Sequence, residues 1–351
     1  MKRKLYTAYS CGVTIYDRPH IGHARTYIAW DAIIRYLRYQ GHLVYLVQNF
    51  TDVDQKIILK SKNKNVSPRY LTERYINAYH RDFDALNVTR ADEYPRVTDH
   101  IPDIISFIQD LVTQGYAYET DSGVYFSLGK ARQYGSVSGR KNLIQDKTFD
   151  FALWKTRDDY GWDSPWGKGV PGWHIECSAL IDKYLNNPIS IHFGGSDLMF
   201  PHHENENAQT LAKTGNTIAR QWFHSGLVRV AGDKMSKSSG NAVYISDLTR
   251  DFDPMAIRLW ALQSHYKASP TFSLDAIAAA EKGYRKLRKV AQPGEARDLD
   301  VISRFEEYMS DDFNTPRAIA LLFSLAKKKD GRSRNTLEHL MRVLGFKTME
   351  N

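Results

Sequence analysis

Residues 5–47 read LYTAYSCGVTIYDRPHIGHARTYIAWDAIIRYLRYQGHLVYLV, and their pattern predicts a strand, a helix and a second strand. Leu5–Tyr16 is rich in tyrosine, threonine, valine and isoleucine, as buried strands are, and the turn residues Asp17-Arg18-Pro19 end it. Apolar residues recur at helical spacing over Ile28–Leu37, and Gly41 marks the end of the helix. The continuous apolar run after Gly41 suits a parallel sheet that is covered on both faces.

The rest of the chain extends this unit into an α/β fold. From Gly123 to Trp166 the sequence is turn-rich and aromatic, which is typical of an insertion into a parent fold. Gly172–Cys177 then opens a helix, and Ile189–His192 predicts another strand of the parent sheet, with a further one between Trp222 and Val230. Because strands of such sheets bind ligands at their carboxyl ends, we expect the functional site there.

Composition describes a globular, basic protein. The 351 residues suggest two or three domains, and a mean hydropathy of −0.49 without an apolar window of about 18 residues excludes a membrane protein. Polar residues after Lys4 interrupt any signal peptide, so we expect a cytoplasmic chain. Its net charge of +8 favours a polyanionic partner such as RNA. The basic clusters at 281–289 and 327–334 fit that partner, although a solvated helix face has the same pattern.

The turn His20-Ile21-Gly22-His23 lies where the first strand passes into the helix. Backbone N–H groups and the positive end of the helix dipole point outward at such a turn, which suits a phosphate. Two imidazoles there can donate hydrogen bonds to phosphate oxygens and to developing charge. Alternatively, the two histidines only cap the helix or pack against it.

A second polar stretch, Lys234-Met-Ser-Lys-Ser-Ser-Gly-Asn241, has the composition of a loop that can close. Its two lysines, Lys234 and Lys237, can clamp a triphosphate as mobile point charges. On its own, a solvated loop explains the stretch equally well. Together with the His20–His23 turn it is a strong signal.

These two stretches are the HIGH and KMSKS signatures, so the sequence resembles class I aminoacyl-tRNA synthetases. Further motifs resemble the cysteinyl-tRNA synthetase family, from about Tyr9 to the last helices. They are Cys11-Gly-Val-Thr-Ile-Tyr-Asp17, Thr51-Asp-Val-Asp54, Pro171-Gly-Trp-His-Ile-Glu-Cys-Ser178, Ser196-Asp-Leu-Met-Phe-Pro-His-His-Glu-Asn-Glu206 and Asp311-Asp-Phe-Asn-Thr-Pro316.

The two cysteines are too few for a disulfide framework. Together with a histidine and a glutamate, they indicate a metal site. Cys11 and Cys177 are the only thiols, and His202 and Glu206 stand four residues apart, so on a helix they project from one face. Two sulfurs, one imidazole and one carboxylate make a zinc set. From the residues alone, buried inert thiols are an alternative, and His203 or Glu204 can replace their neighbours. The resemblance places one zinc ion on Cys11, Cys177, His202 and Glu206.

The resemblance also implies a reaction and its residues. ATP, with Mg²⁺, would bind at His20, Gly22, His23 and Lys237, and His20, His23, Lys234 and Lys237 would stabilise attack of the cysteine carboxylate on the α-phosphate. Thr51, Trp173 and Asp197, with His192 nearby, would hold the amino-acid ends of the substrate. The cysteinyl group would pass from cysteinyl-adenylate to tRNA(Cys). Direct coordination of the substrate thiolate by zinc would distinguish cysteine from serine without an editing domain.

The expected architecture follows from the same resemblance. A Rossmann-type catalytic domain would cover residues 1–230, with a connective insertion at about 115–165. The KMSKS loop and a stem-contact region would follow at 231–275, and a helical tRNA-binding bundle at 276–351, without the usual C-terminal anticodon-contacting domain. Two residues depart from the family pattern: Phe193 replaces a glycine, which we expect to narrow or reshape the pocket beside His192, and Gln55 replaces an aspartate.

Three functions are compatible with the motifs of this sequence. The first is charging of tRNA with cysteine, by a chain that we take to be a monomer. The second is an ATP-dependent ligase that joins cysteine to an amino sugar, as in the related mycothiol-pathway enzyme. The third is a noncatalytic RNA-binding relative, but such a protein is expected to lose HIGH or KMSKS residues, and both are present.

Overall fold

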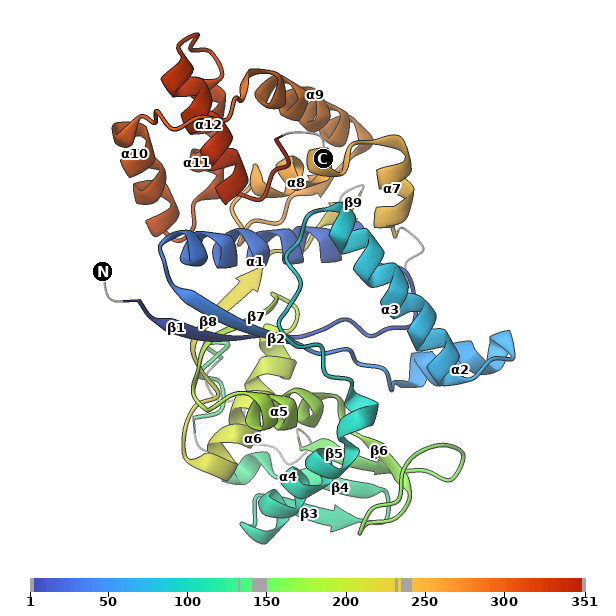
Figure 1. The fold of residues 1–351 in the computed structure, drawn as a ribbon. Coiled ribbons are helices and arrows are strands. Elements are labelled where there is room, and N and C mark those ends of the chain that lie inside the picture. Colours follow the sequence, from blue (N-terminus) through green and yellow to red (C-terminus); the bar gives the residue numbers. More distant parts are fainter. Residues whose placement is uncertain (1–2, 132, 141–149, 231–232, 235–241, 349–351) are drawn as a thin grey trace.

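The centre of the molecule is a parallel sheet, seen edge-on in Figure 1. The computed structural model describes residues 3–131, 133–140, 150–230, 233–234 and 242–348. Four strands lie in the order β2-β1-β7-β8, and every neighbouring pair is parallel. Their bounds are Leu5–Ser10 (β1), Leu43–Gln48 (β2), Ile189–Gly195 (β7) and Ala219–Ser225 (β8). Helix α1 (Ile21–Tyr39) joins β1 to β2, so the predicted strand-helix-strand unit and the α/β fold are confirmed.

Two of the predicted strands end earlier in the structure than the sequence pattern indicates. β1 stops at Ser10 instead of Tyr16, because the backbone at Gly12 crosses the end of β2: a Cβ there would lie 1.5 Å from the carbonyl oxygen of Asn49. The chain after Ser10 pairs again with the extension of β2 at an isolated parallel bridge between Thr14 and Thr51. The predicted strand from Trp222 to Val230 is two strands, β8 and β9 (Arg229–Val230). β9 pairs with β10 (Asp233–Lys234) and β11 (Thr271–Phe272) in a separate sheet.

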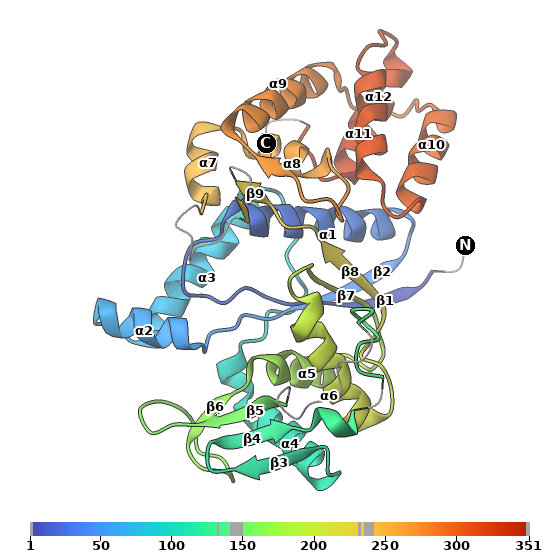
Figure 2. The same cartoon turned by 180° about the vertical axis from the view of Figure 1, so that it is seen from behind.

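Helices cover both faces of the central sheet. α1 lies on one face, between the sheet and the C-terminal helices, and its apolar side belongs to a core shared with them. On the other face lie α4 (Ile101–Thr113), α5 (Trp173–Tyr184) and α6 (Glu204–Thr214), which share a second core (Figure 2). The helices α2 (Gln55–Lys64) and α3 (Pro68–Ala85) and the short turns η1 (Val97–His100) and η4 (Met199–His203) complete this part.

The insertion forms a small antiparallel sheet beneath α4 and α5. Its strand order is β3-β4-β5-β6, with bounds Ala117–Thr120, Gly123–Phe126, Phe151–Thr156 and Gly169–Pro171, and the turn η2 covers Leu128–Lys130. Trp154 of β5 is fully buried among the second core. β6 leads directly into α5, so the insertion supports one of the helices that carry the site.

The C-terminal part is helical. Side-chain caps start most of its helices: Asp253, Ser273, Asp298, Asn314 and Asp330 each accept a hydrogen bond from a backbone N–H of the first turn. The helices are α7 (Ile245–Asp251), α8 (Pro254–Leu262), α9 (Leu274–Val290), α10 (Leu299–Ser310), α11 (Thr315–Leu325) and α12 (Gly331–Val343). Among the described residues, no helix combines the length and the apolar character that a bilayer crossing requires.

Candidate active site and metal centre

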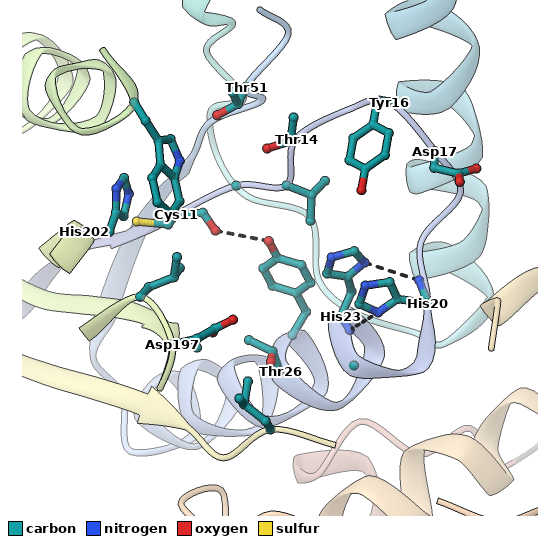
Figure 3. Close-up of a pocket in the computed structure, with 18 of the residues that line it drawn as sticks. Cys11, Thr14, Tyr16, Asp17, His20, His23, Thr26, Thr51, Asp197 and His202 are labelled. Atoms are coloured by element: carbon teal, nitrogen blue, oxygen red, sulfur yellow. Dashed lines mark hydrogen bonds between the residues drawn. The ribbon is translucent and has the colours of Figure 1, made fainter. Parts of the chain in front are cut away.

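A cavity of about 660 Å³ opens at the carboxyl ends of the parallel strands (Figure 3). Its walls come from the segments that follow all four strands, with Cys11 after β1, Thr51 after β2, Asp197 after β7 and Gly226 after β8. The first turn of α1 and the start of α5 complete the walls. The cavity therefore lies where the fold class predicts a ligand site.

Four predicted metal ligands meet at one end of this cavity. Ligand atoms of Cys11, Cys177, His202 and Glu206 all lie within 4.8 Å of one another, and all four residues are buried. Cys11 comes from the loop after β1, Cys177 from α5, and the other two from the η4–α6 junction. The structure thus brings together residues that are up to 195 positions apart.

Their spacing fits a tetrahedral ion. Bonds of about 2.3 Å to sulfur and about 2.0–2.1 Å to nitrogen or oxygen separate the ligands of tetrahedral zinc by roughly 3.3–3.8 Å. The two sulfurs lie 3.9 Å apart, Cys177 Sγ lies 3.6 Å from His202 Nε2, and Cys11 Sγ lies 3.5 Å from Glu206 Oε1. The 2.9 Å contact between His202 and Glu206 is shorter, as expected of an ion pair.

Burial and mutual interactions shift the pKa values of these four residues strongly. Burial opposes ionisation of Glu206, but the charges of His202 and His192 outweigh it and hold the pKa of Glu206 well below its usual range. Burial likewise opposes the charged form of His202, yet Glu206 and Cys177 raise its pKa to about 10. A hydrogen bond from Cys11 lowers the pKa of Cys177 to about 6.

Two further histidines orient His202 and Glu206 by contacting the side-chain atoms that point away from the other ligands. Nδ1 of His202 lies 2.8 Å from His174 Nδ1, so its Nε2 faces the thiols. Oε2 of Glu206 lies 2.8 Å from His192 Nε2, so its Oε1 faces His202. Outer contacts of this kind fix the orientation of metal ligands. The sequence prediction missed His174 in this role, because only the fold brings it to His202.

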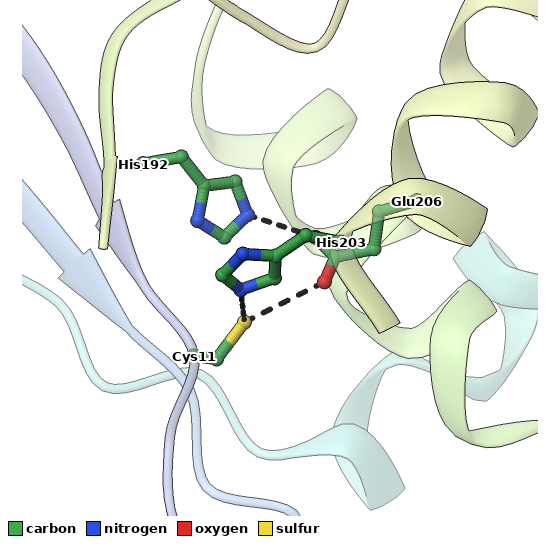
Figure 4. Close-up of side chains that lie close together, drawn as sticks. All are labelled: Cys11, His192, His203 and Glu206. Carbon is green, nitrogen blue, oxygen red and sulfur yellow. Dashed lines mark hydrogen bonds and ion pairs between the residues drawn. The ribbon is translucent and has the colours of Figure 1, made fainter. Parts of the chain in front are cut away.

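His203 forms a second group, with Cys11, His192 and Glu206 (Figure 4). Its Nε2 lies 3.3 Å from Cys11 Sγ, and its Nδ1 lies 2.8 Å from His224 Nε2. However, Cys11, Cys177 and His202 line the cavity, whereas His192 and His203 lie outside its lining. A metal that must reach a substrate in the cavity is therefore better placed on the set that includes His202.

The residues expected to hold the amino acid divide into two groups. Thr51, Trp173 and Asp197 line the cavity. The indole of Trp173 is 46% exposed and stacks on the His202 ring at 4.4 Å, so it forms a wall beside the metal ligands. His192 is fully buried, stacks on Trp222 and contacts Glu206, which makes it a support for the metal set.

His20 and His23 close the other end of the cavity (Figure 3). Their rings stack at 3.6 Å, and each Nδ1 accepts a hydrogen bond of 3.3 Å from the backbone N–H of the other residue. They therefore cap α1 and line the cavity at once, together with Gly22. The capping bonds fix both rings at the positive end of the helix dipole.

Part of the KMSKS stretch, including Lys237, lies outside the described residues. Lys234 is described only as the end of β10. On the far side of the stretch, Val243 accepts a hydrogen bond of 2.8 Å from the N–H of Ile21, and Tyr244 bridges His20. Val243 and Tyr244, which follow the stretch, therefore contact the start of α1 through a backbone hydrogen bond and a β-bridge.

Neither of the two departures from the family pattern is among the residues that line the cavity. Phe193 is buried on the face of β7 opposite to His192 and stacks on Trp30 of α1 at 4.8 Å. The expected narrowing beside His192 is therefore wrong, because adjacent strand residues point to opposite faces. Gln55 starts α2 and accepts a 2.9 Å hydrogen bond from Arg157 of the insertion.

Comparisons with known proteins agree with this geometry. Residues 1–282 match the family described as tRNA synthetases class I (C) catalytic domain, and residues 304–347 match the DALR domain. A cysteine–tRNA ligase of Synechococcus elongatus is 43% identical over 94% of this chain and 76% of its own length. The chain belongs to the cysteine–tRNA ligase family. Another family member, from Picosynechococcus, is 42% identical over 97% of this chain and 77% of its own length.

A solved structure extends the likeness to the fold. Methionyl-tRNA synthetase of Mycobacterium tuberculosis, in complex with methionyl-adenylate, superposes with a TM-score of 0.71 over 97% of this chain and 89% of that chain. Its sequence is 19% identical to this cysteine–tRNA ligase family member, so the likeness concerns the fold alone.

Proposed function

We propose that the chain activates L-cysteine with ATP and transfers the cysteinyl group to the 3′ end of tRNA(Cys). The observation that carries this proposal is one cavity with two thiols at one end and the stacked imidazoles of His20 and His23 at the other. The first end suits a thiol substrate and the second a phosphate. The names of the relatives support the same reaction.

Selection of cysteine would take place at the metal ligands. Cys11, Cys177, His202 and Glu206 would hold a zinc ion, since their donor types and spacing fit it. When bound, the zinc would accept the substrate sulfur as a thiolate, which the far less acidic alcohol of serine cannot match. An apolar pocket alone separates such isosteres by only ~1–3 kcal/mol. No separate editing step is then needed.

The cavity walls would orient the rest of the amino acid. Thr51 and Asp197 offer a hydroxyl and a carboxylate to its ammonium and carboxylate ends, and Trp173 closes the side next to His202. Gly195 matters here because a Cβ on it would lie 2.5 Å from Asp197 Oδ1. His192 would act on the substrate only indirectly, through Glu206.

ATP would bind at His20, Gly22 and His23, with Mg²⁺ on its phosphates and with Lys234 and Lys237 as further cations. In-line attack of the cysteine carboxylate on the α-phosphate needs positioning and charge neutralisation more than covalent help. Two imidazoles held rigid at a helix N-terminus supply both. The products of this step would be cysteinyl-adenylate and pyrophosphate.

The enzyme would act as a monomer, and the tRNA would approach it from the side of the C-terminal helices. α9 carries basic residues along its exposed side, and a second basic cluster lies just before and at the start of α12. Such surfaces bind a phosphate backbone. The terminal ribose hydroxyl would attack the adenylate and release AMP.

A single assay series tests this proposal. Purified protein receives cysteine and ATP, and pyrophosphate exchange is measured first; total tRNA or the amino sugar is then added and AMP release and aminoacylation are followed. We expect exchange with cysteine, none with serine, and charging of tRNA. His23→Gln should abolish exchange, whereas His339→Gln, on α12 and remote from the cavity, should not. Exchange without tRNA charging, with AMP release on the amino sugar, would overturn the proposal in favour of the sugar ligase.

A further inference from the structure

The segment that carries His202 and Glu206 begins irregularly. η4 is a π-helix, and Phe200 within it has non-helical angles (φ −138°, ψ 130°). α6 starts one residue after His203, whose side chain makes no capping hydrogen bond. The irregular residue precedes both ligands, whereas His203 and Glu204 between them have helical angles. Local helix geometry therefore sets the spacing of His202 and Glu206, and contacts from elsewhere help to fix the position of the segment as a whole.

Glu204 lies between the two ligands and supplies such a contact. Its side chain is only 1% exposed, and its carboxylate is directed to the insertion. Oε1 accepts a hydrogen bond of 2.8 Å from the N–H of Gly135, and Oε2 accepts bonds of 3.1 Å and 2.8 Å from the N–H groups of Val137 and Ser138. Hydrogen bonds to a carboxylate are stronger than neutral ones.

The loop 133–140 is shaped to surround this carboxylate. Gly135 has a φ of +98°, and a Cβ on it would lie 1.9 Å from the carbonyl oxygen of Arg140, so only glycine allows this fold of the loop. Successive backbone N–H groups turned inward in this way form a concave site for an anion. Here the anion is a side chain of the same protein.

Two neighbouring contacts tie the same loop to the same segment. Tyr134 donates a hydrogen bond of 2.6 Å from its hydroxyl to Asn205 Oδ1. The guanidinium of Arg140 lies 4.2 Å from the centre of the Phe200 ring. The loop therefore contacts the segment 200–206 before, at and after Glu204. Among the side chains that make these contacts, the carboxylate of Glu204 is the only buried charged group.

We propose that Glu204 is a positioning residue of the metal centre: it fastens the loop 133–140 of the insertion to the turn that carries His202 and Glu206, and so determines how long the metal is retained. This inference rests on the proposed zinc site. It gives the connective insertion a role in the chemistry, because release of the loop would let the two ligands move relative to Cys11 and Cys177.

The test measures zinc loss, not activity. The zinc-loaded full chain, Glu204→Gln and Glu204→Ala are mixed with an excess of a chromophoric chelator, and the rate constant of zinc release is recorded. Glu338→Gln is the matched control, since Glu338 is a buried carboxylate (6% exposed) on the remote helix α12. Removing residues that orient metal ligands weakens metal binding roughly 10–100-fold. We expect at least a tenfold faster release for both Glu204 variants and less than a twofold change for the control.

Two further readouts separate the possible failures. Amide hydrogen exchange should be faster at Gly135, Val137 and Ser138 in the Glu204 variants, while urea unfolding midpoints detect a general loss of stability. Zinc release at the unmodified rate in a variant with exposed amides would overturn the inference and leave the zinc site intact. A freshly purified, unmodified chain that holds no zinc would overturn both.

Discussion

Arg258 of α8 offers a sharp test of how the helical part is attached to the catalytic sheet. The residue is fully buried and pairs with the carboxylate of Asp31, in the middle of α1. It also donates hydrogen bonds to three carbonyl oxygens, those of Leu86 at 3.1 Å, Asn87 at 3.2 Å and Leu344 at 2.8 Å. One guanidinium thus joins α1, the loop after α3 and the turn that ends α12.

Replacement by leucine should be costly. Removing one partner of a buried ion pair costs about 3–5 kcal/mol, and each buried carbonyl left without a donor adds about 1–3 kcal/mol unless water replaces it. Arg35 still pairs with Asp31 and still donates to the Asn87 carbonyl, each at 2.8 Å, so only the carbonyls of Leu86 and Leu344 lose their donor. We therefore expect Arg258→Leu to lower the free energy of unfolding by at least about 4 kcal/mol.

Urea unfolding followed by tryptophan fluorescence measures this change. Arg285→Leu is the control: Arg285 pairs with Glu281 at 3.1 Å, but its side chain is 71% exposed. Such an exposed pair is worth less than about 1 kcal/mol. A loss below about 1 kcal/mol for Arg258→Leu, or equal losses for the two variants, would refute the reasoning.

Three further predictions concern charge, metal and pocket wall. Burial opposes ionisation of Asp31, but Arg258 and Arg35 lower its pKa. The contribution of Asp31 to stability is therefore complete above about pH 4 and is lost as the pH falls through the lowered pKa. Between pH 5 and pH 2, the urea unfolding midpoint should fall less steeply for Asp31→Asn than for the unmodified chain. Cys177→Ser should remove zinc, measured by elemental analysis, together with cysteine-dependent pyrophosphate exchange; full exchange by a zinc-free variant would contradict this. Trp173→Ala should raise KM for cysteine about fivefold through the lost stacking on His202, worth about 1 kcal/mol, and leave KM for ATP unchanged in the same assay.

Local patterns predicted the framework of the fold. The run from Leu5 to Val47 carries enough apolar periodicity to define β1, α1 and β2, and Gly41, with φ +82°, ends α1 as expected. The exact end of β1 was not predictable, because it depends on the close approach of Gly12 to Asn49, a contact between distant segments.

The site was predicted less evenly. Spacing suggested that His202 and Glu206 share a face, and Cys11 and Cys177 were candidates as the only thiols. The family resemblance then placed the zinc on these four residues. The histidines behind them were missed: His174 is 28 positions from its partner His202, and no local pattern signals that contact. Phe193 was misread although strand alternation was available, since its neighbour His192 already occupied the site-facing side of β7.

The selection of substrate by its sulfur has a direct spectroscopic test. The zinc-depleted chain is loaded with Co²⁺, and its absorption spectrum is recorded before and after addition of cysteine, with serine as the control. We predict a stronger sulfur-to-cobalt charge-transfer band and altered visible bands with cysteine and no change with serine. An unchanged spectrum at saturating cysteine, in a protein that still catalyses pyrophosphate exchange, would contradict the proposed role of the metal.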